Sequence, residues 1–463
     1  MTVDRARLAS LLAGETARFV AEHPRSKALA KRAEASLLGG VPMPWMVRWA
    51  GGFPIFAAGA SGAHLTDVDG HRYLDLCLGD TGAMTGHAPP ATVEAVRGQA
   101  RRGFTFMLPT EDAIWVGEEL SRRFGLPYWQ FALTATDANR FAIRLAREIT
   151  GRPLILVYNW CYHGTVDETF VTLRNGRVVP RDGNIGPPVD PALTTRVVEF
   201  NDLAALEAAL DPGDVACVLA EPALTNVGIV HPDPGYHTAL REITRRTGTL
   251  LILDETHTIS AGPGGYTRVH GLDPDVLTLG KPIAGGVPAA VYGVTEPVAE
   301  RIRARSSVDL ADTGGIGGTL AANPLAAAAM RATLETVLTE SAYQRTIPLA
   351  ERFAVGVEAV IGEHGLPWTV QRLGCRAEYW FRPLPPRNGG EAAAVVDPDL
   401  ERYMHLAALN RGILLTPFHN MALIAPAVTE ADIDRHTEVF RESVEALTCG
   451  ARHGAEVVTR PGL

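Results

Sequence analysis

The sequence has few cysteines, no long apolar run and no excess of positive charge. No stretch approaches the roughly 20 uninterrupted apolar residues of a membrane-spanning helix, so we expect no membrane partner. The net charge of −9 gives no electrostatic reason to expect nucleic-acid binding. Five scattered cysteines without any CxxC spacing argue against a disulfide scaffold or a zinc site, and we expect no metal; they are Cys77, Cys161, Cys217, Cys375 and Cys449.

The N-terminal segment 1–35 is charged and lacks the apolar core of a signal peptide, so the cytoplasm is the expected location. The apolar fraction of 46% and the charged fraction of 21% are ordinary for a globular protein. A chain of 463 residues exceeds one ordinary core, which predicts two domains or one large domain with a smaller one attached.

The middle of the chain alternates short apolar runs with helical patterns. This alternation predicts an α/β fold with a mostly parallel sheet and helices on its faces. The expected strands are 154–158, 216–220, 250–253, 276–279 and 289–294, and the expected helices include 203–210, 235–247 and 324–340. The two chain ends resemble each other in character. We therefore expect a small α/β domain built from residues 1–85 and 326–463, and a large domain from residues 86–325.

Two of the apolar runs end in residues that carry chemistry. Asp254 follows the run 250–253, and Lys281 follows the run 276–279 after one glycine. Ligands of open α/β sheets gather outside the carboxyl ends of the strands, so neighbouring strands would present both groups to one pocket. Pyridoxal phosphate (PLP) chemistry needs this pair: a lysine to form the Schiff base and an acid to hold the pyridinium nitrogen protonated.

Taken alone, each residue has a simpler interpretation. Aspartate is common at strand ends, and most lysines are solvated. Lys281, however, precedes Pro282 and the glycine pair 285–286, a setting that could desolvate its amine. The pair is therefore a stronger signal than either member.

Nine segments in order along the chain carry a resemblance to a known family. They are LTDVDGHRYLDL, GHAPP, PTEDA, TATDANRFAIRLAR, YHG, EP, DET, LGKPIAGGVP and GGTLAANPLA. The sequence resembles class III, fold type I PLP-dependent aminotransferases, near glutamate-1-semialdehyde aminomutase and the β-amino-acid and amine transaminases. The resemblance implies pyridoxal 5'-phosphate as cofactor and a homodimer with active sites shared at the subunit interface.

The resemblance also implies roles for single residues. Lys281 would bind the cofactor's aldehyde carbon and later serve as base, and Asp254 would pair with the ring nitrogen. The start of the helix at 134 would seat the phosphate on its free N–H groups, although an ordinary capping cluster would look alike. The other implied cofactor-binding residues are Ala135 and Thr136 for the phosphate, Tyr162 for ring stacking, Glu221 near the ring hydroxyl, and Thr319 for the partner subunit's phosphate. For Tyr162 and Glu221, core packing and structural support are the alternatives.

Some positions depart from the pattern of the family. Thr256 and His257 follow the Asp-Glu pair, where an apolar residue and then a polar or Met residue are usual. His257 could tune protonation in the site, or could simply be a structural hydrogen-bonding residue. Asp80 stands where substrate-facing residues of the family lie, and it could select a cationic group or cap a turn.

The substrate is less constrained by the sequence. The arginine that β-amino-acid transaminases place after an N-terminal glycine pair is missing, and the direction of Arg48 is open. Trp45 and Phe418 suggest a pocket with aromatic walls that favours a hydrophobic or aromatic amine or amino acid. Arg372 and Arg376 are candidates for a carboxylate clamp, since arginine can bind a carboxylate bidentately.

The main functional prediction is an aminotransferase that moves an amino group from an amine or amino acid to a keto acid or aldehyde by a ping-pong mechanism. The alternative is a PLP-dependent aminomutase of the glutamate-1-semialdehyde type, a decarboxylase or a racemase, because these enzymes use the same cofactor frame. A non-catalytic relative is disfavoured, because such a protein would be free to lose Lys281.

Overall fold

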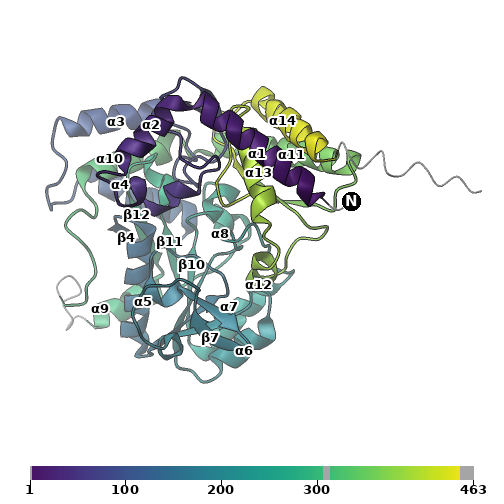
Figure 1. Ribbon diagram of the computed structural model, residues 1–463. Helices are drawn as coiled ribbons and strands as arrows, with labels where there is room; N and C mark the ends of the chain where they lie inside the picture. Colours follow the sequence, from purple (N-terminus) through teal and green to yellow (C-terminus); the bar gives the residue numbers. More distant parts are fainter. Residues whose placement is uncertain (1–2, 306–312, 449–463) are drawn as a thin grey trace, which may run out of the picture.

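The computed structural model describes residues 3–305 and 313–448. In this part of the chain, seven strands form the central sheet in the order β4-β12-β11-β10-β9-β5-β8 (Figure 1). β12 runs antiparallel to both neighbours, and the other strands share one direction, so the expected mostly parallel sheet is confirmed. The strands are β4 (Tyr128–Ala132), β5 (Leu154–Tyr158), β8 (Thr195–Val198), β9 (Val215–Ala220), β10 (Leu250–Asp254), β11 (Val276–Leu279) and β12 (Ala290–Val294).

Helices cover both faces of this sheet, which explains why its strands read as continuous apolar runs. Alternate residues of β5 face opposite sides. Ile155 and Val157 pack in the core cluster of α5 (Ala135–Thr150), whereas Leu156 and Tyr158 pack in that of α6 (Leu203–Leu210) and α7 (Tyr236–Thr247). The flanking helices include α3 (Pro90–Ala100), α4 (Glu111–Phe124), α8 (Gly265–Val269), α9 (Glu296–Ala304) and α10 (Pro324–Thr336).

The two ends of the chain meet in a second sheet. The hairpin expected near residue 65 is present as β2 (His64–Asp67) and β3 (Arg72–Asp75), preceded by β1 (Ala57–Ser61). β15 (Ile413–Leu414) pairs in parallel with β3. In Figure 1 the N-terminal α1 (Arg5–Glu22) crosses above α13 (Pro398–Leu409), with α2 (Pro24–Ala33) beside it. The division into residues 1–85 with 326–463 and residues 86–325 stays a proposal.

The C-terminal region combines helices with a small antiparallel sheet. Its strands are β13 (Thr369–Leu373), β14 (Arg376–Trp380) and β16 (Met421–Leu423), and its helices are α11 (Glu340–Glu363), α12 (Gly389–Ala393) and α14 (Glu430–Thr448). The helix expected over 324–340 is shorter than predicted. α10 ends at Thr336, and Thr339 caps the start of α11 by accepting a hydrogen bond from the Ala342 amide.

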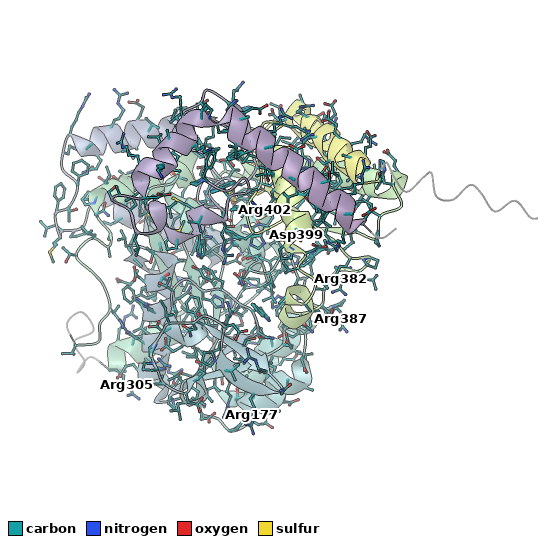
Figure 2. The ribbon with its side chains drawn as sticks, viewed as in Figure 1. Arg177, Arg305, Arg382, Arg387, Asp399 and Arg402 are labelled. Atoms are coloured by element: carbon teal, nitrogen blue, oxygen red, sulfur yellow. The ribbon has the colours of Figure 1, made fainter. Side chains whose placement is uncertain are left out.

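Short elements complete the described chain. β6 (Val171–Arg174) and β7 (Arg177–Pro180) form a hairpin. The 3-10 helices are η1 (Leu38–Gly40), η2 (Pro44–Arg48), η3 (Asp167–Thr169), η4 (Pro191–Leu193), η5 (Thr258–Ala261) and η6 (Lys281–Ala284). Charged side chains such as Arg177, Arg305 and Arg387 extend outward at the edges of the molecule (Figure 2).

Within the described residues, no helix is long and apolar enough to cross a membrane. Cys77, Cys161, Cys217 and Cys375 are buried and form no disulfide, whereas Cys449 lies outside the described residues.

Candidate active site

Asp254 and Lys281 come from the carboxyl ends of two neighbouring strands. β10 and β11 are parallel, and their register pairs Asp254 with Thr278. Lys281 follows β11 after Gly280, and both side chains line one cavity of about 460 Å³. The sequence argument that placed a carboxylate and an amine at one strand-end crevice therefore agrees with the geometry.

The carboxylate of Asp254 is buried and fully engaged. Its Oδ2 accepts hydrogen bonds from Asn139 Nδ2 at 2.8 Å and from His163 Nδ1 at 2.9 Å, and its Oδ1 accepts from the Thr256 amide at 3.1 Å. Burial would raise the pKa of Asp254, but the hydrogen bond and charge of His163 outweigh it and lower the pKa. Asp254 is therefore ionised, as a partner for a protonated ring nitrogen must be.

Sequence reasoning assigned no role to Asn139 or His163. Asn139 Oδ1 accepts a hydrogen bond from the Thr278 hydroxyl at 2.6 Å, which fixes the amide so that its NH₂ group faces Asp254. Both residues lie inside segments that the sequence singled out, TATDAN and YHG, so the signal was present. The sequence could not show that Asn139 and His163 lie within hydrogen-bonding distance of Asp254.

The start of α5 forms one wall of the cavity. Thr134 caps the helix by accepting a hydrogen bond from the Asp137 amide, and Ala135 and Thr136 line the cavity. The Thr165 amide donates to Thr136 Oγ1 at 3.0 Å, which ties the loop after β5 to the helix. A helix N-terminus presents free N–H groups and a partial positive charge, so this wall suits a phosphate dianion.

Tyr162 and Glu221 also line the same cavity. Glu221 is 3% exposed; its Oε2 accepts a hydrogen bond from Thr225, and its Oε1 is buried without a partner. Burial raises the pKa of Glu221 to about 7. A buried carboxyl oxygen that lines a cavity and has no partner can take part in a hydrogen bond with a bound ligand.

The amine of Lys281 contacts two polar side chains. Nζ lies 2.9 Å from Asp80 Oδ2 and 2.8 Å from His257 Nε2. Burial would raise the pKa of Asp80, but the charge of Lys281, together with the nearby imidazoles of His257 and His419 and the guanidinium of Arg376, outweighs it, so the pKa of Asp80 is lowered. Asp80 therefore lies against the lysine, and its predicted role toward a substrate stays a proposal.

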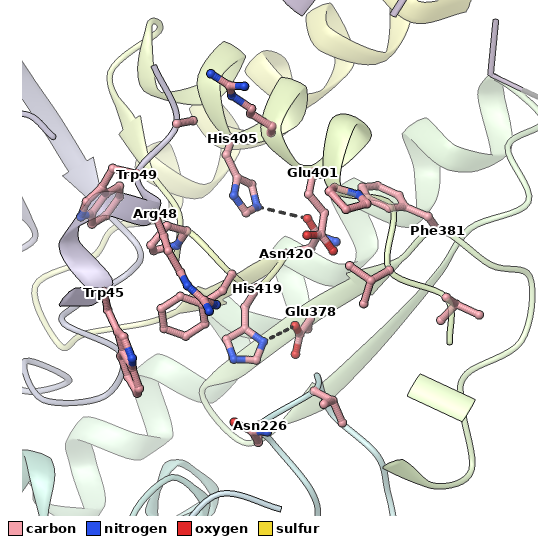
Figure 3. Close-up of a pocket in the computed structure, with 18 of the residues that line it drawn as sticks. Trp45, Arg48, Trp49, Asn226, Glu378, Phe381, Glu401, His405, His419 and Asn420 are labelled. Atoms are coloured by element: carbon pink, nitrogen blue, oxygen red, sulfur yellow. Dashed lines mark hydrogen bonds and ion pairs between the residues drawn. The ribbon is translucent and has the colours of Figure 1, made fainter. Parts of the chain in front are cut away.

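A second, larger cavity of about 700 Å³ adjoins the first, and Tyr162 lines both. The ring of Trp45 lies 5.6 Å from that of Tyr162 and 5.5 Å from that of Phe418, so three aromatic rings form one wall. Arg48 extends toward this wall, with its guanidinium 6.0 Å from the Phe418 ring (Figure 3). The direction of Arg48, which the sequence left open, is thus into the cavity.

The other side of this larger cavity is polar. His419 Nδ1 lies 3.1 Å from Glu378 Oε1, and His405 Nε2 lies 3.1 Å from Asn420 Oδ1 (Figure 3). Glu401 also lines it, and burial raises its pKa to about 7. The cavity therefore offers an aromatic wall, one arginine close to that wall and a set of hydrogen-bonding groups.

Three other predicted residues lie elsewhere. Thr319 is exposed and lines neither cavity, so a role at the partner subunit's phosphate stays a prediction. Arg372 is directed away from the site: its side chain is 45% exposed and pairs with Glu351 at 3.6 Å. Arg376 is fully buried behind His257, so neither arginine forms the suggested carboxylate clamp.

One group of possible metal ligands occurs among the described residues, namely His23, Asp67 and His71. Tyr73 donates a hydrogen bond to Asp67 Oδ2 and contacts His23 Nε2, each at 2.7 Å. These side chains line neither cavity, and their polar atoms are engaged with one another.

The residues that line the smaller cavity fit pyridoxal 5'-phosphate. An ionised aspartate, an amine, an aromatic ring and a helix N-terminus face one space, and Glu221 Oε1 is buried there without a partner. A flat cationic heterocycle with an aldehyde and a phosphate uses each of these groups.

Comparison with known proteins supports this fit. The sequence model of the family Aminotransferase class-III matches residues 46–444. The chain belongs to this family. Its fold is accordingly that of fold type I PLP-dependent enzymes, and its cofactor is pyridoxal 5'-phosphate.

The relatives of this class III enzyme include aminomutases and transaminases. Glutamate-1-semialdehyde 2,1-aminomutase of Sorangium cellulosum is 37% identical over 433 residues, which cover 91% of this chain and 97% of the relative. A glutamate-1-semialdehyde-aminomutase structure from Pseudomonas aeruginosa PAO1 is 51% identical, with a TM-score of 0.94 and coverage of 96% and 100%. A lysine-to-alanine variant of it was solved in complex with PMP. An omega-transaminase from Sphaerobacter thermophilus is 29% identical, with a TM-score of 0.83 and coverage of 91% and 97%.

Proposed function

We propose that this chain is a PLP-dependent aminomutase, an enzyme that exchanges an amino group and a carbonyl between neighbouring carbons of one substrate. The relatives named as aminomutases support this more than they support the aminotransferase that the sequence favoured. The structural observation that carries the proposal is the meeting of Asp254 and Lys281 at adjacent strand ends in one cavity.

In this proposal, different residues of the smaller cavity bind the cofactor and transfer protons. When bound, the cofactor supplies an aldehyde that takes up the substrate amine and a ring that accepts electrons. Asp254 would hold the ring nitrogen protonated, Tyr162 would stack on the ring, and Glu221 would face the ring hydroxyl. Ala135 and Thr136 would hold the phosphate with the amides of α5, joined by Thr319 of a second subunit in a homodimer.

Lys281 would have two tasks. It would bind the cofactor's aldehyde carbon covalently, and once the substrate amine displaces it, its free amine would move a proton between the substrate carbon that bears the nitrogen and the cofactor's aldehyde carbon. Its position supports this, because its flexible four-carbon side chain begins just after the carboxyl end of β11 and can move within the cavity without leaving it.

The larger cavity would hold the rest of the substrate. Trp45 and Phe418 would contact its carbon chain, and Arg48 would bind a carboxylate. A carboxylated amino aldehyde, as in the names of the aminomutase relatives, is the substrate class that fits these groups. Asp80 lies too close to Lys281 to be assigned to the substrate on distance alone.

The second candidate function is an aminotransferase that works by a ping-pong mechanism. Its supporting observations are the omega-transaminase neighbour and the size of the second cavity, about 700 Å³, which leaves room for two different substrates in turn. Its donor would be an amine or amino acid, and its acceptor a keto acid or aldehyde.

One experiment separates the candidates. The PLP-loaded enzyme is mixed with glutamate 1-semialdehyde alone, and the product in which amino group and carbonyl have exchanged carbons is followed by mass spectrometry and NMR. Formation of this product without an added acceptor supports the aminomutase. Turnover only when an amine donor and a keto acid are both present supports the aminotransferase, and loss of carbon dioxide or of chirality would point to a decarboxylase or racemase. The Lys281→Ala variant is the inactive control.

A further inference from the structure

The polar side of the larger cavity carries two carboxyl side chains that differ in their partners. Glu378 is 5% exposed; its Oε1 lies 3.1 Å from His419 Nδ1, and its Oε2 accepts a hydrogen bond from the Ile229 amide at 3.1 Å. Burial would lower the pKa of His419, but Glu378 outweighs it and raises this pKa, so the imidazole favours its charged form. The charge of Glu378 is therefore compensated within the protein.

Glu401 has no such partner. It lies in the first turn of α13, lines the cavity and extends from its helix toward the side where Glu378 and His419 lie (Figure 3). In the part of the chain that the structure describes, its carboxyl group forms no hydrogen bond and no ion pair. Burial raises the pKa of this carboxyl to about 7; the charges of Glu378 and Asp397 add to the effect, and His419 opposes it.

The arginines of the cavity leave Glu401 unpaired. Arg48 lies against the aromatic wall, and Arg181 donates hydrogen bonds to two main-chain oxygen atoms. Arg402, the next residue on α13, is exposed, and none of the three forms an ion pair with Glu401 among the described residues. A negative charge at Glu401 would thus have only His419 to balance it, and that imidazole is already paired with Glu378.

A second side chain at this end of the cavity also has an unused polar atom. Tyr379 lines the cavity and is 1% exposed, and its hydroxyl is buried without a hydrogen-bond partner in the described chain. Burial raises the pKa of Tyr379, and the charge of Glu401 raises it further, which places the hydroxyl near that carboxyl. Buried polar groups nearly always have a partner, so an unpartnered hydroxyl close to an unpaired carboxyl indicates a site for a ligand group.

An unpaired carboxylate in a shielded cavity is best compensated by a cation, because a neutral donor leaves the charge in place. We propose that Glu401 binds an ammonium group on the tail of the substrate, the end remote from the reacting amine, and that the Tyr379 hydroxyl accepts a second hydrogen bond from it. The substrate class is then an amine or amino aldehyde with a second, unreacting amino group. This inference rests on the proposed function, in which the larger cavity holds the rest of the substrate. The cavity volume of about 700 Å³ is ample for such a tail.

Three amines of equal length test the role of the charge. 1,5-Diaminopentane, 5-amino-1-pentanol and hexylamine share the reacting amine and the chain, and they end in an ammonium, a hydroxyl and a methyl group. Each is added to the PLP-loaded enzyme, and the loss of the visible absorbance of the lysine-bound cofactor gives its half-saturating concentration, whatever reaction follows. A parallel series of lysine, 6-hydroxynorleucine and 2-aminoheptanoate adds a carboxylate to the same three tails.

Two substitutions remove the proposed contact. Glu401→Gln keeps the size of the side chain and removes its charge, whereas Glu401→Met also removes its polar atoms. Hydrogen bonds between charged groups are about twice as strong as neutral ones, so the half-saturating concentrations of diaminopentane and lysine should rise about tenfold in both variants. Those of hexylamine and 2-aminoheptanoate should change by less than about threefold, because a methyl group makes no such bond. Glu358→Gln, an exposed position on α11, is the control and should change none of these values.

Three results overturn the inference. An equal change for all three tails would show that Glu401 only supports the cavity, and no change for any tail would show that it does not contact the substrate. Equal weakening of the ammonium and hydroxyl tails would show that a neutral donor is sufficient. The glutamine variant alone decides between these results if the methionine variant does not fold.

Failure of the proposed function would look different. If no amine or amino acid of either series altered the absorbance of the wild-type enzyme, no substrate amine would be displacing Lys281, and both proposals would fall. If the chain is an aminotransferase instead of an aminomutase, the preference for an ammonium tail would persist, and the assay with glutamate 1-semialdehyde separates these two functions.

Discussion

His163 Nδ1 lies 2.9 Å from Asp254 Oδ2, and both side chains are almost completely shielded from solvent. Burial alone would lower the pKa of His163, but Cys161 and Asp254 raise it, so the imidazole is charged. His163 and Asp254 therefore form a buried ion pair. Removing one partner of a buried pair leaves the other charge uncompensated, which costs about 3–5 kcal/mol.

The first prediction concerns Asp254→Asn. This variant keeps the shape of the side chain but removes the charge that would hold a protonated ring nitrogen, so turnover should fall by roughly 10²–10³-fold or more, at about tenfold for each 1.4 kcal/mol. Cofactor affinity should weaken as well, measured by equilibrium dialysis with PLP. Asp182→Asn is the matched control, because the Asp182 side chain is 89% exposed. Unchanged turnover with intact cofactor binding would contradict the role of Asp254.

The second prediction concerns Lys281→Ala. Without this amine no covalent bond to the cofactor can form, so the visible absorbance of the lysine-bound cofactor should be lost and turnover should fall to background. Lys27→Ala, an exposed position on α2, should leave both unchanged. An absorption spectrum identical to wild type in the Lys281 variant would refute the assignment.

The third prediction tests whether the start of α5, the cavity wall that suits a phosphate, is needed for PLP binding. It does so by a change that alters only the packing against Thr136. A side chain at Gly164 would overlap Thr136, with the added Cβ 2.9 Å from the Thr136 Cα, and φ at this glycine is +75°. Gly164→Ala should displace the start of α5 and weaken PLP binding by about tenfold or more. Gly176→Ala is the control, because its φ of +72° imposes similar backbone strain while nothing lies within 4 Å of the added Cβ. Equal PLP affinity in both variants would argue against the wall at Thr136.

The elements of the central sheet were predictable because their strands are buried on both faces. The runs 154–158 and 276–279 match β5 and β11 as predicted, and the positions of Asp254 and Lys281 follow from where the runs 250–253 and 276–279 end. The direction of each strand was harder to predict from the sequence. β12 has the same apolar character as its neighbours yet runs antiparallel to them, because strand direction depends on the connection between strands and not on composition.

Contacts between distant segments account for what the sequence could not predict. His257 was noted as a departure from the family, but its partner Arg376 lies 119 residues away and was assigned instead to a carboxylate clamp. The break between α10 and α11 was missed because Leu334, Val337 and Leu338 continue the apolar helical spacing up to the cap residue Thr339. Long-range distances of this kind leave no periodic signal.

The fourth prediction concerns pH and Glu221. Its pKa in the folded state is raised from 4.5 to about 7 by burial, so the folded protein favours the protonated form. The stabilising contribution is fully present below about pH 4.5 and is lost as the pH rises through about 7. Relative to wild type, cofactor-free Glu221→Gln should therefore gain stability as the pH rises from about 5 to 8, by up to about 3 kcal/mol at 1.4 kcal/mol per pKa unit. Urea unfolding across this range measures the difference, and a constant difference would contradict the pKa shift.

The fifth prediction locates the substrate carboxylate at Arg48. This residue lines the larger cavity beside Phe418, and we expect it to take the place of the arginine that the sequence lacks at its expected position. A charge-assisted hydrogen bond is worth about 1.5–3 kcal/mol, so Arg48→Leu should raise KM for a carboxylated substrate by roughly 10–100-fold and leave kcat nearly unchanged.

The control for Arg48 has two parts. Arg177→Leu removes an exposed arginine of β7 and should change neither constant (Figure 2). A substrate amine that lacks a carboxylate should show a KM within about threefold of wild type in the Arg48 variant, because it never used the guanidinium. If KM rises equally for both substrates, Arg48 supports the aromatic wall through its packing on Phe418, and the carboxylate must be bound by another of the arginines that line this cavity, Arg181 or Arg402.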